Sequence, residues 1–85
     1  MCEVRNDAEV ALKNVNTKLD DEIGYLIYMK GIYTRSAEEW YRKWVDSRDV
    51  ACRKTADKYF ESGYKCHKAI KVLESLKEQI EKEIM

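Results

Sequence analysis

Few side chains in this sequence could carry chemistry, and the single histidine is the first to consider. His67 directly follows Cys66, and Cys52 lies fourteen residues before Cys66. Neighbouring residues on a helix point about 100° apart, so Cys66 and His67 cannot converge on one metal ion or act as a nucleophile and its base. The sequence has no second histidine, no CxxC pair and no HExxH motif, and a metal site built from Cys52, Cys66 and His67 would need a carboxylate as its fourth ligand. We therefore expect no metal site, no cofactor and no catalytic residue.

The carboxylates occur in consecutive runs. Asp20, Asp21 and Glu22 are adjacent, and so are Glu38 and Glu39. Consecutive side chains on a helix point in different directions, so these runs do not build the paired acid and base of a hydrolase. They are typical of solvated helical surfaces, and no glycine-rich phosphate-binding loop accompanies them. The sequence indicates a protein that is not an enzyme.

Length and charge narrow the class of protein further. A chain of 85 residues holds one domain, which we place over residues 1–85. Sixteen Lys and Arg residues balance sixteen Asp and Glu residues, and this zero net charge argues against a nucleic-acid-binding protein, which needs a basic surplus. No run of 18 apolar residues occurs, so we expect no membrane span. The chain has no proline and three glycines, too little punctuation for an all-β fold.

Apolar residues spaced three and four apart predict three amphipathic helices. Gly31 gives the first helix a C-terminal stop, Ser36 and Glu39 form a capping box that starts the second, and Ser62-Gly63 separate the second from the third. The links are short, so neighbouring helices should be antiparallel. We expect an all-α, up-down-up three-helix bundle. Its helices would cover about residues 4–30, 37–61 and 64–84.

The aromatic residues are expected to gather at the two ends of this bundle. Trp40 and Tyr41 are adjacent and cannot both face inward, so one of them should be exposed. Exposed Trp and Tyr residues are typical of protein-binding hot spots. The group expected at the first end is Tyr25, Tyr28, Tyr33, Trp40, Tyr41 and Trp44, and the group at the other is Tyr59, Phe60 and Tyr64.

The cysteines leave two possibilities open. If the second helix continues to Ser62, Cys52 and Cys66 differ in height by roughly 10 Å along the bundle axis, which is too far for a disulfide. If that helix ends at about residues 53–56, the segment that follows can fold back and bring the two thiols together. The chain has three cysteines, so at least one thiol lacks an intrachain partner.

One segment resembles a known family. The pattern Trp44-x-x-x-Arg48-Asp49-x-x-Cys52 is similar to the signature of the bacterial LprI-like lysozyme-inhibitor family, whose members are small secreted helical domains. Residues 11–19 resemble that family's first helix, with Asn16 where an aromatic residue is usual, and Cys2 falls near a family cysteine. Cys66 precedes a leucine-rich helix and resembles the cysteine that heads the family's last helix. The segment between Cys52 and Cys66 is shorter than usual, and the family's Thr and Arg early in the last helix are replaced.

The resemblance implies that Cys52 and Cys66 form a disulfide, which requires a break in the second helix after Cys52. The motif also has a physical rationale of its own. Trp44, Arg48 and Cys52 are four residues apart, so they would stack on one helical face with the Arg48 stem against the indole. Asp49 lies beside that face, where it could form a cross-helix ion pair. We interpret Trp44, Arg48, Asp49 and Cys52 as residues that specify the fold.

The resemblance implies a non-catalytic, protein-binding domain of the bacterial envelope that occludes the cleft of a lysozyme. Many lysozymes are basic, so an acidic patch beside exposed aromatics would bind them. Two alternatives remain: a cytosolic or phage-like helical module that binds another protein, and a homodimer whose third helix forms a coiled-coil seam. We expect a periplasmic or secreted protein if a leader was removed, in which case a lipid anchor at Cys2 is open, and a cytoplasmic protein otherwise. The residues expected to bind the partner are Asp20, Asp21, Glu22, Glu38, Glu39, Trp40 and Tyr41.

Overall fold

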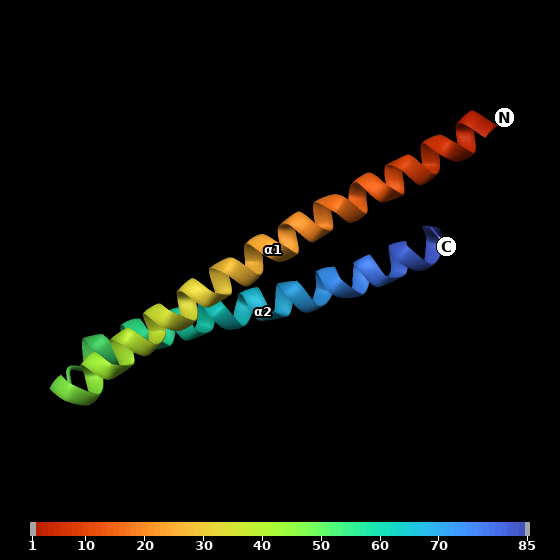
Figure 1. The fold of residues 1–85 in the computed structure, drawn as a ribbon. Helices are drawn as coiled ribbons and strands as arrows, with labels where there is room; N and C mark the ends of the chain where they lie inside the picture. The colour runs from red at the N-terminus through yellow and green to blue at the C-terminus, as the bar shows by residue number, and fades with distance from the viewer. Residues whose placement is uncertain (1, 85) are drawn as a thin grey trace.

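The computed structural model describes residues 2–84, with the side chains of residues 7–83, and shows two long antiparallel helices joined as a hairpin (Figure 1). Helix α1 runs from Cys2 to Ser47 and helix α2 from Val50 to Ile84. The hairpin measures 69 × 15 × 14 Å, so it is an extended rod. The all-α class is confirmed, but the three-helix bundle is wrong. The predicted second helix is divided between α1 and α2, and the predicted first link is helical.

Helix α1 continues through the predicted link because the signals that predicted a stop there are weak. Gly31 costs a helix about 1 kcal/mol relative to alanine, whereas proline costs about 3 kcal/mol. A capping box allows a helix to start but does not force one to do so. Beyond Gly31, the half-buried Tyr33, the buried Ala37 and the half-buried Trp40 keep the same side of α1 against α2. Packing against α2 therefore outweighs the local preference for a stop.

The two helices meet along a seam with the spacing of an antiparallel coiled coil. Its residues recur on each helix at alternating steps of three and four, and all of them are buried or half-buried. Two charged residues and one amide interrupt the seam, and the amide oxygen of Asn16 is buried without a hydrogen-bond partner. The seam of α1 contains Leu12, Asn16, Leu19, Ile23, Leu26, Lys30, Tyr33, Ala37, Trp40 and Trp44, and that of α2 contains Cys52, Ala56, Tyr59, Gly63, Cys66, Ile70, Leu73, Lys77 and Ile80.

Small residues bring the helices together in the half of the hairpin near the turn. Ala37 and Ala56 are fully buried, and a Cβ atom added to Gly63 would lie 3.6 Å from Thr34 Oγ1 and 3.7 Å from Tyr33 Cβ. This close approach explains why α2 continues through Ser62-Gly63, which the sequence suggested as a link. Toward the termini the seam contains no alanine or glycine, and the two ribbons lie further apart (Figure 1).

The real turn lies inside the Trp44–Cys52 motif. Arg48 has a positive φ of 57°, and its N–H donates a hydrogen bond to the Trp44 carbonyl oxygen at 2.6 Å. This left-handed residue closes α1 in the way that glycine usually does. The expected stacking of Trp44, Arg48 and Cys52 on one helical face is therefore wrong, because α1 ends at Ser47. The expected break after Cys52 is also wrong, because α2 is continuous from Val50.

Asp49 starts the second helix. Its Oδ1 accepts a hydrogen bond from the Ala51 N–H at 2.9 Å, and its own N–H donates to Ser47 Oγ at 3.2 Å. A side-chain acceptor before the first turn satisfies a backbone N–H that has no partner within the helix. Asp49 therefore acts as a cap, and no ion pair from it to another helix occurs within the described residues.

Candidate protein-binding surfaces

The residues first considered for chemistry, Cys52, Cys66 and His67, all lie on helix α2. Lys30 Nζ lies 3.1 Å from His67 Nδ1, so the lysine donates a hydrogen bond across the seam and the imidazole accepts it. Cys52 and Cys66 are both free and half-buried. They lie fourteen residues apart on one helix, about 21 Å at 1.5 Å per residue, so the disulfide that the resemblance implied is excluded in this fold. Within the described residues, no three His, Cys, Asp or Glu side chains could hold a metal ion together.

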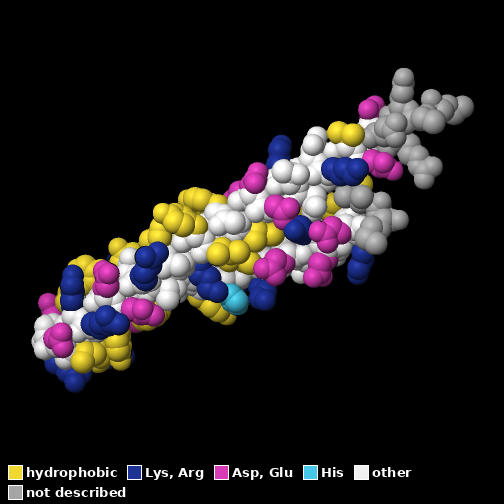
Figure 2. Space-filling view, in the orientation of Figure 1, with side chains coloured by type: hydrophobic (Ala, Val, Ile, Leu, Met, Phe, Trp, Pro, Cys, Tyr) yellow, Lys and Arg dark blue, Asp and Glu magenta, His cyan; other side chains and the backbone are white. Residues whose placement is uncertain are grey.

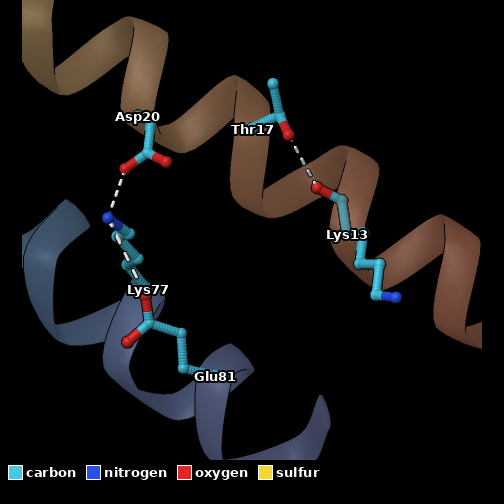
Figure 3. A network of polar contacts seen from close by, with 5 residues as sticks. All are labelled: Lys13, Thr17, Asp20, Lys77 and Glu81. Atoms are coloured by element: carbon cyan, nitrogen blue, oxygen red, sulfur yellow. Dashed lines mark hydrogen bonds and ion pairs between the residues drawn. The ribbon is translucent and has the colours of Figure 1, made fainter.

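The two acidic runs lie apart on α1. Sixteen residues separate Glu22 from Glu38, which is about 24 Å along the helix, so the runs do not form one patch. Asp20 is engaged with Lys77 of α2, and Figure 3 shows Lys77 between Asp20 and Glu81. The hydrogen bond to Asp20 raises the pKa of Lys77 above its ordinary value of 10.5. The remaining members of the two runs are exposed to solvent.

The first aromatic group does not gather at one end, because all six of its members lie along the single helix α1. From Tyr25 to Trp44 the helix rises by about 28 Å. Trp40 is half-buried on the seam and Tyr41 is 46% exposed, so the expectation that one of the two faces outward is confirmed.

Part of that group forms a cluster at the turn. The Arg48 and Arg53 guanidinium groups lie 5.0 and 4.9 Å from the centre of the Trp44 ring, and the Tyr41 ring lies 5.4 Å from it. Arg48 belongs to the turn and Arg53 to α2, so the indole of α1 is in contact with both sides of the connection. We call Tyr41, Trp44, Arg48 and Arg53 the turn cluster. That Trp44 and Arg48 specify the fold stays a prediction.

A different segment exposes the most unusual surface. Residues 23–34, here the central segment, contain no acidic residue and one basic residue, Lys30, which faces α2. A helix that is apolar on all sides is normally buried, but α2 covers only one side of this one. Tyr25, Ile27 and Tyr28 are 58%, 55% and 64% exposed. The sequence analysis missed this surface because it interpreted the segment as the end of a helix within a bundle; the apolar residues on every side were the available signal.

Helix α2 adds further exposed apolar residues at the same level of the rod. Val72 and Leu76 flank the central segment on one side, and Phe60 and Tyr64 lie on the other side, nearer the turn. Figure 2 shows hydrophobic side chains gathered on the middle of the rod and beside the turn, whereas charged side chains dominate toward the termini.

Charge is distributed unevenly along the rod. The turn end, residues 42–58, has six basic and three acidic side chains. The opposite end, over the described side chains of residues 7–23 and 74–83, has four basic and nine acidic side chains. The zero net charge of the chain therefore conceals a basic end and an acidic end, and both can take part in electrostatic recognition of a partner.

A shallow depression near the end of α2 is the remaining candidate. Gln79, Ile80, Lys82 and Glu83 line it, and they present no pair of groups suited to catalysis. No helix within residues 2–84 combines the length and apolar character that a membrane crossing requires. Comparison of the chain with protein-family models, with curated proteins and with solved structures found no match.

Proposed function

We propose that this protein is a non-catalytic interaction module, a helical hairpin that docks its uncovered apolar surface on another protein. The observation that carries the proposal is the central segment, which is apolar on every side while its hairpin partner covers one side only. An exposed apolar surface with polar surroundings marks a binding site more often than a functionless surface. Tyrosine side chains supply large contact areas with few rotatable bonds, and they are frequent at interfaces.

The packing of the hairpin supports the same conclusion. Within the described part of the chain, only Ala37, Ala56 and Ile70 are buried apolar residues, and no large side chain is fully buried. Two helices alone cannot enclose a core, so a hairpin of this kind gains stability when another surface covers it. A partner would therefore bind and stabilise the module at the same time.

Replacement of the exposed tyrosines tests the proposal. The double variant Y25Q/Y28Q removes two exposed rings while keeping good helix formers, and R42Q/D46N is a matched control at exposed positions on the same helix. We expect crosslinking in cells that produce the protein to join the wild type and the control to the same protein partner, and the tyrosine variant to lose it. Equal crosslinking by all three forms would contradict the proposal.

A lysozyme is the partner that the resemblance to the LprI-like family names. One observation favours it: Asp21 and Glu22 are exposed within one turn of Tyr25, so a basic protein would meet acidic and aromatic side chains together. The test is turbidimetric lysis of cell walls by lysozyme with the protein in molar excess, with D21N/E22Q as the variant and D57N as the control. Unchanged lysis would remove lysozyme from consideration and leave the interaction module intact.

The two free thiols provide an argument about the cellular compartment of the protein. Cys52 and Cys66 are free and cannot pair with each other in the hairpin, which favours a reducing compartment and hence the alternative of a cytoplasmic module.

A further inference from the structure

The surface of α1 that points away from α2 carries an apolar stripe of its own. Tyr28 lies two residues from both Leu26 and Lys30 of the seam, so it points roughly 160° away from each. Residues three and four apart extend this stripe in both directions along the helix. We call it the outer face; it consists of Asp21, Gly24, Tyr25, Tyr28, Gly31, Ile32 and Arg35.

Two glycines on the outer face have no explanation within the hairpin. A Cβ atom added to Gly24 or Gly31 would meet nothing within 4 Å, whereas one added to Gly63 would touch the opposite helix. Glycine in a helix interior lowers the folding equilibrium about fivefold relative to alanine. Close approach of another molecule at Gly24 and Gly31 would explain both residues.

The outer face is complementary to itself. When two α1 helices lie antiparallel with a two-fold axis at Tyr28, residues equally distant from Tyr28 on opposite sides meet. Tyr25 of one copy then lies over Gly31 of the other, and Ile32 lies over Gly24. Large side chains therefore meet the positions that leave room for them, and each such contact occurs twice.

The charges that border the stripe agree with this arrangement. Asp21 and Arg35 are each seven residues from Tyr28, and both are exposed without an ion-pair partner in the described part of the hairpin. Lys18 and Glu38 are each ten residues from Tyr28. The two-fold axis therefore places an acidic side chain opposite a basic one at both distances. If the two helices are offset by one residue, Lys18 still lies opposite an acidic side chain, that of Glu39. It also points the basic turn end of each hairpin toward the acidic end of the other.

We infer that the outer face of α1 binds the outer face of a second copy, with Tyr28 at the two-fold axis. The inference rests on the proposed function and names its partner. A second copy accounts for the exposed tyrosines, the two glycines and the opposed charges together. An unrelated apolar partner would not require the glycines or the opposed charges. It also differs from the homodimer expected from the sequence, because it uses α1 rather than the C-terminal stripe, which faces α1 inside the hairpin.

Sedimentation equilibrium with charge reversal tests the inference. We expect the wild type to approach twice the chain mass of 10.1 kDa between about 10 μM and 1 mM, which covers the affinities of small interfaces. R35D places Asp21 opposite an aspartate at two symmetric sites and should weaken the dimer at least about tenfold. The charge swap D21R/R35D should restore it to within about threefold of the wild type, and K71D, at an exposed position of α2 outside both charged ends, should leave it unchanged.

A glycine variant gives an independent readout. G31A should raise the helicity of the monomer and yet weaken dimerisation, because a methyl group fills the space expected for Tyr25 of the second copy. A wild type that stays at 10.1 kDa at 1 mM, or a charge swap that fails to restore the dimer lost in R35D, would overturn the inference. Crosslinking of the Y25Q/Y28Q variant distinguishes failure of the dimer inference from failure of the proposed function. If the protein is a monomer but needs these tyrosines to bind another protein, the proposed function stands. If it is a monomer and does not need them, the inference and the proposed function both fail.

Discussion

The guanidinium group of Arg48 lies 5.0 Å from the centre of the Trp44 ring while the Arg48 N–H donates to the Trp44 carbonyl oxygen at 2.6 Å. One residue thus closes the helix with its backbone and covers the indole with its side chain. The backbone conformation needed for this, with φ of 57°, is unfavourable for any residue except glycine, asparagine or aspartate.

Substitution of Arg48 should separate these two contributions. R48A keeps the left-handed strain and loses the contact with Trp44, so we expect a loss of about 0.5–1 kcal/mol of unfolding free energy. R48G loses the same contact but removes the strain, so it should be about 1 kcal/mol more stable than R48A. Urea denaturation followed by circular dichroism, at one protein concentration for all forms, measures both. Equal stability of the two variants would show that the turn is not left-handed at residue 48.

Replacement of Asn16 should stabilise the hairpin. The amide oxygen of Asn16 is buried at a seam position without a partner, and an unsatisfied buried group costs about 1–3 kcal/mol. We expect N16L to raise the unfolding free energy by about 1 kcal/mol or more, because an apolar side chain suits this position. N14L, at an exposed position two residues away, is the control and should change stability by less than about 0.5 kcal/mol. Destabilisation by N16L would mean that the amide has a partner in solution.

The ion pair between Lys77 and Asp20 should make stability depend on alkaline pH. The hydrogen bond from Lys77 to Asp20 raises the pKa of Lys77 above 10.5, so the folded state holds the ammonium proton of Lys77 more tightly than the unfolded state does. The stabilisation is therefore complete below pH 10.5 and is lost as the pH rises through the higher folded value. We expect D20N to be less stable than the wild type at neutral pH and the difference to shrink in strongly alkaline buffer, whereas D57N should show no such trend. A difference that stays constant across this range would argue against the pair.

The cysteines provide a direct test of the fold. In a C2S variant, two thiols per chain should react with a thiol reagent in denaturant, and reductant should not change electrophoretic mobility, because Cys52 and Cys66 are about 21 Å apart on α2. C2S/C66S should show one thiol and remain helical. Fewer than two thiols in C2S with a mobility change on reduction would instead support the pairing that the resemblance implied.

The local part of the structure could be predicted from the sequence. The lack of proline and the spacing of three and four predicted helices over most of the chain. Leu19 and Ile23 on α1, and Ile70 and Leu73 on α2, follow this spacing and lie on the seam. The same spacing would bury Val15, four residues before Leu19, but Val15 is 47% exposed and its neighbour Asn16 faces α2 instead. Apolarity alone could not choose between them, because the register of the opposite helix decides which residue is covered.

The position of the turn could not be predicted from local signals. Gly31 and Ser62-Gly63 are the usual marks of a helix end, yet both lie inside helices, while the chain reverses at Arg48-Asp49, where no glycine occurs. The surfaces predicted for a partner, Glu38 and Glu39 among them, were inferred for a bundle that would have covered the central segment.

The sequence by itself determined that the chain is helical, that it lacks a metal-ligand pattern and that its charges balance, since these follow from composition and from spacing within single helices. Only the tertiary structure decided that there are two helices and that one side of the central segment is left open. The physical reason is that a weak helix breaker costs about 1 kcal/mol, whereas the continuous contact of Tyr33, Ala37 and Trp40 with α2 exists only once both helices are in register.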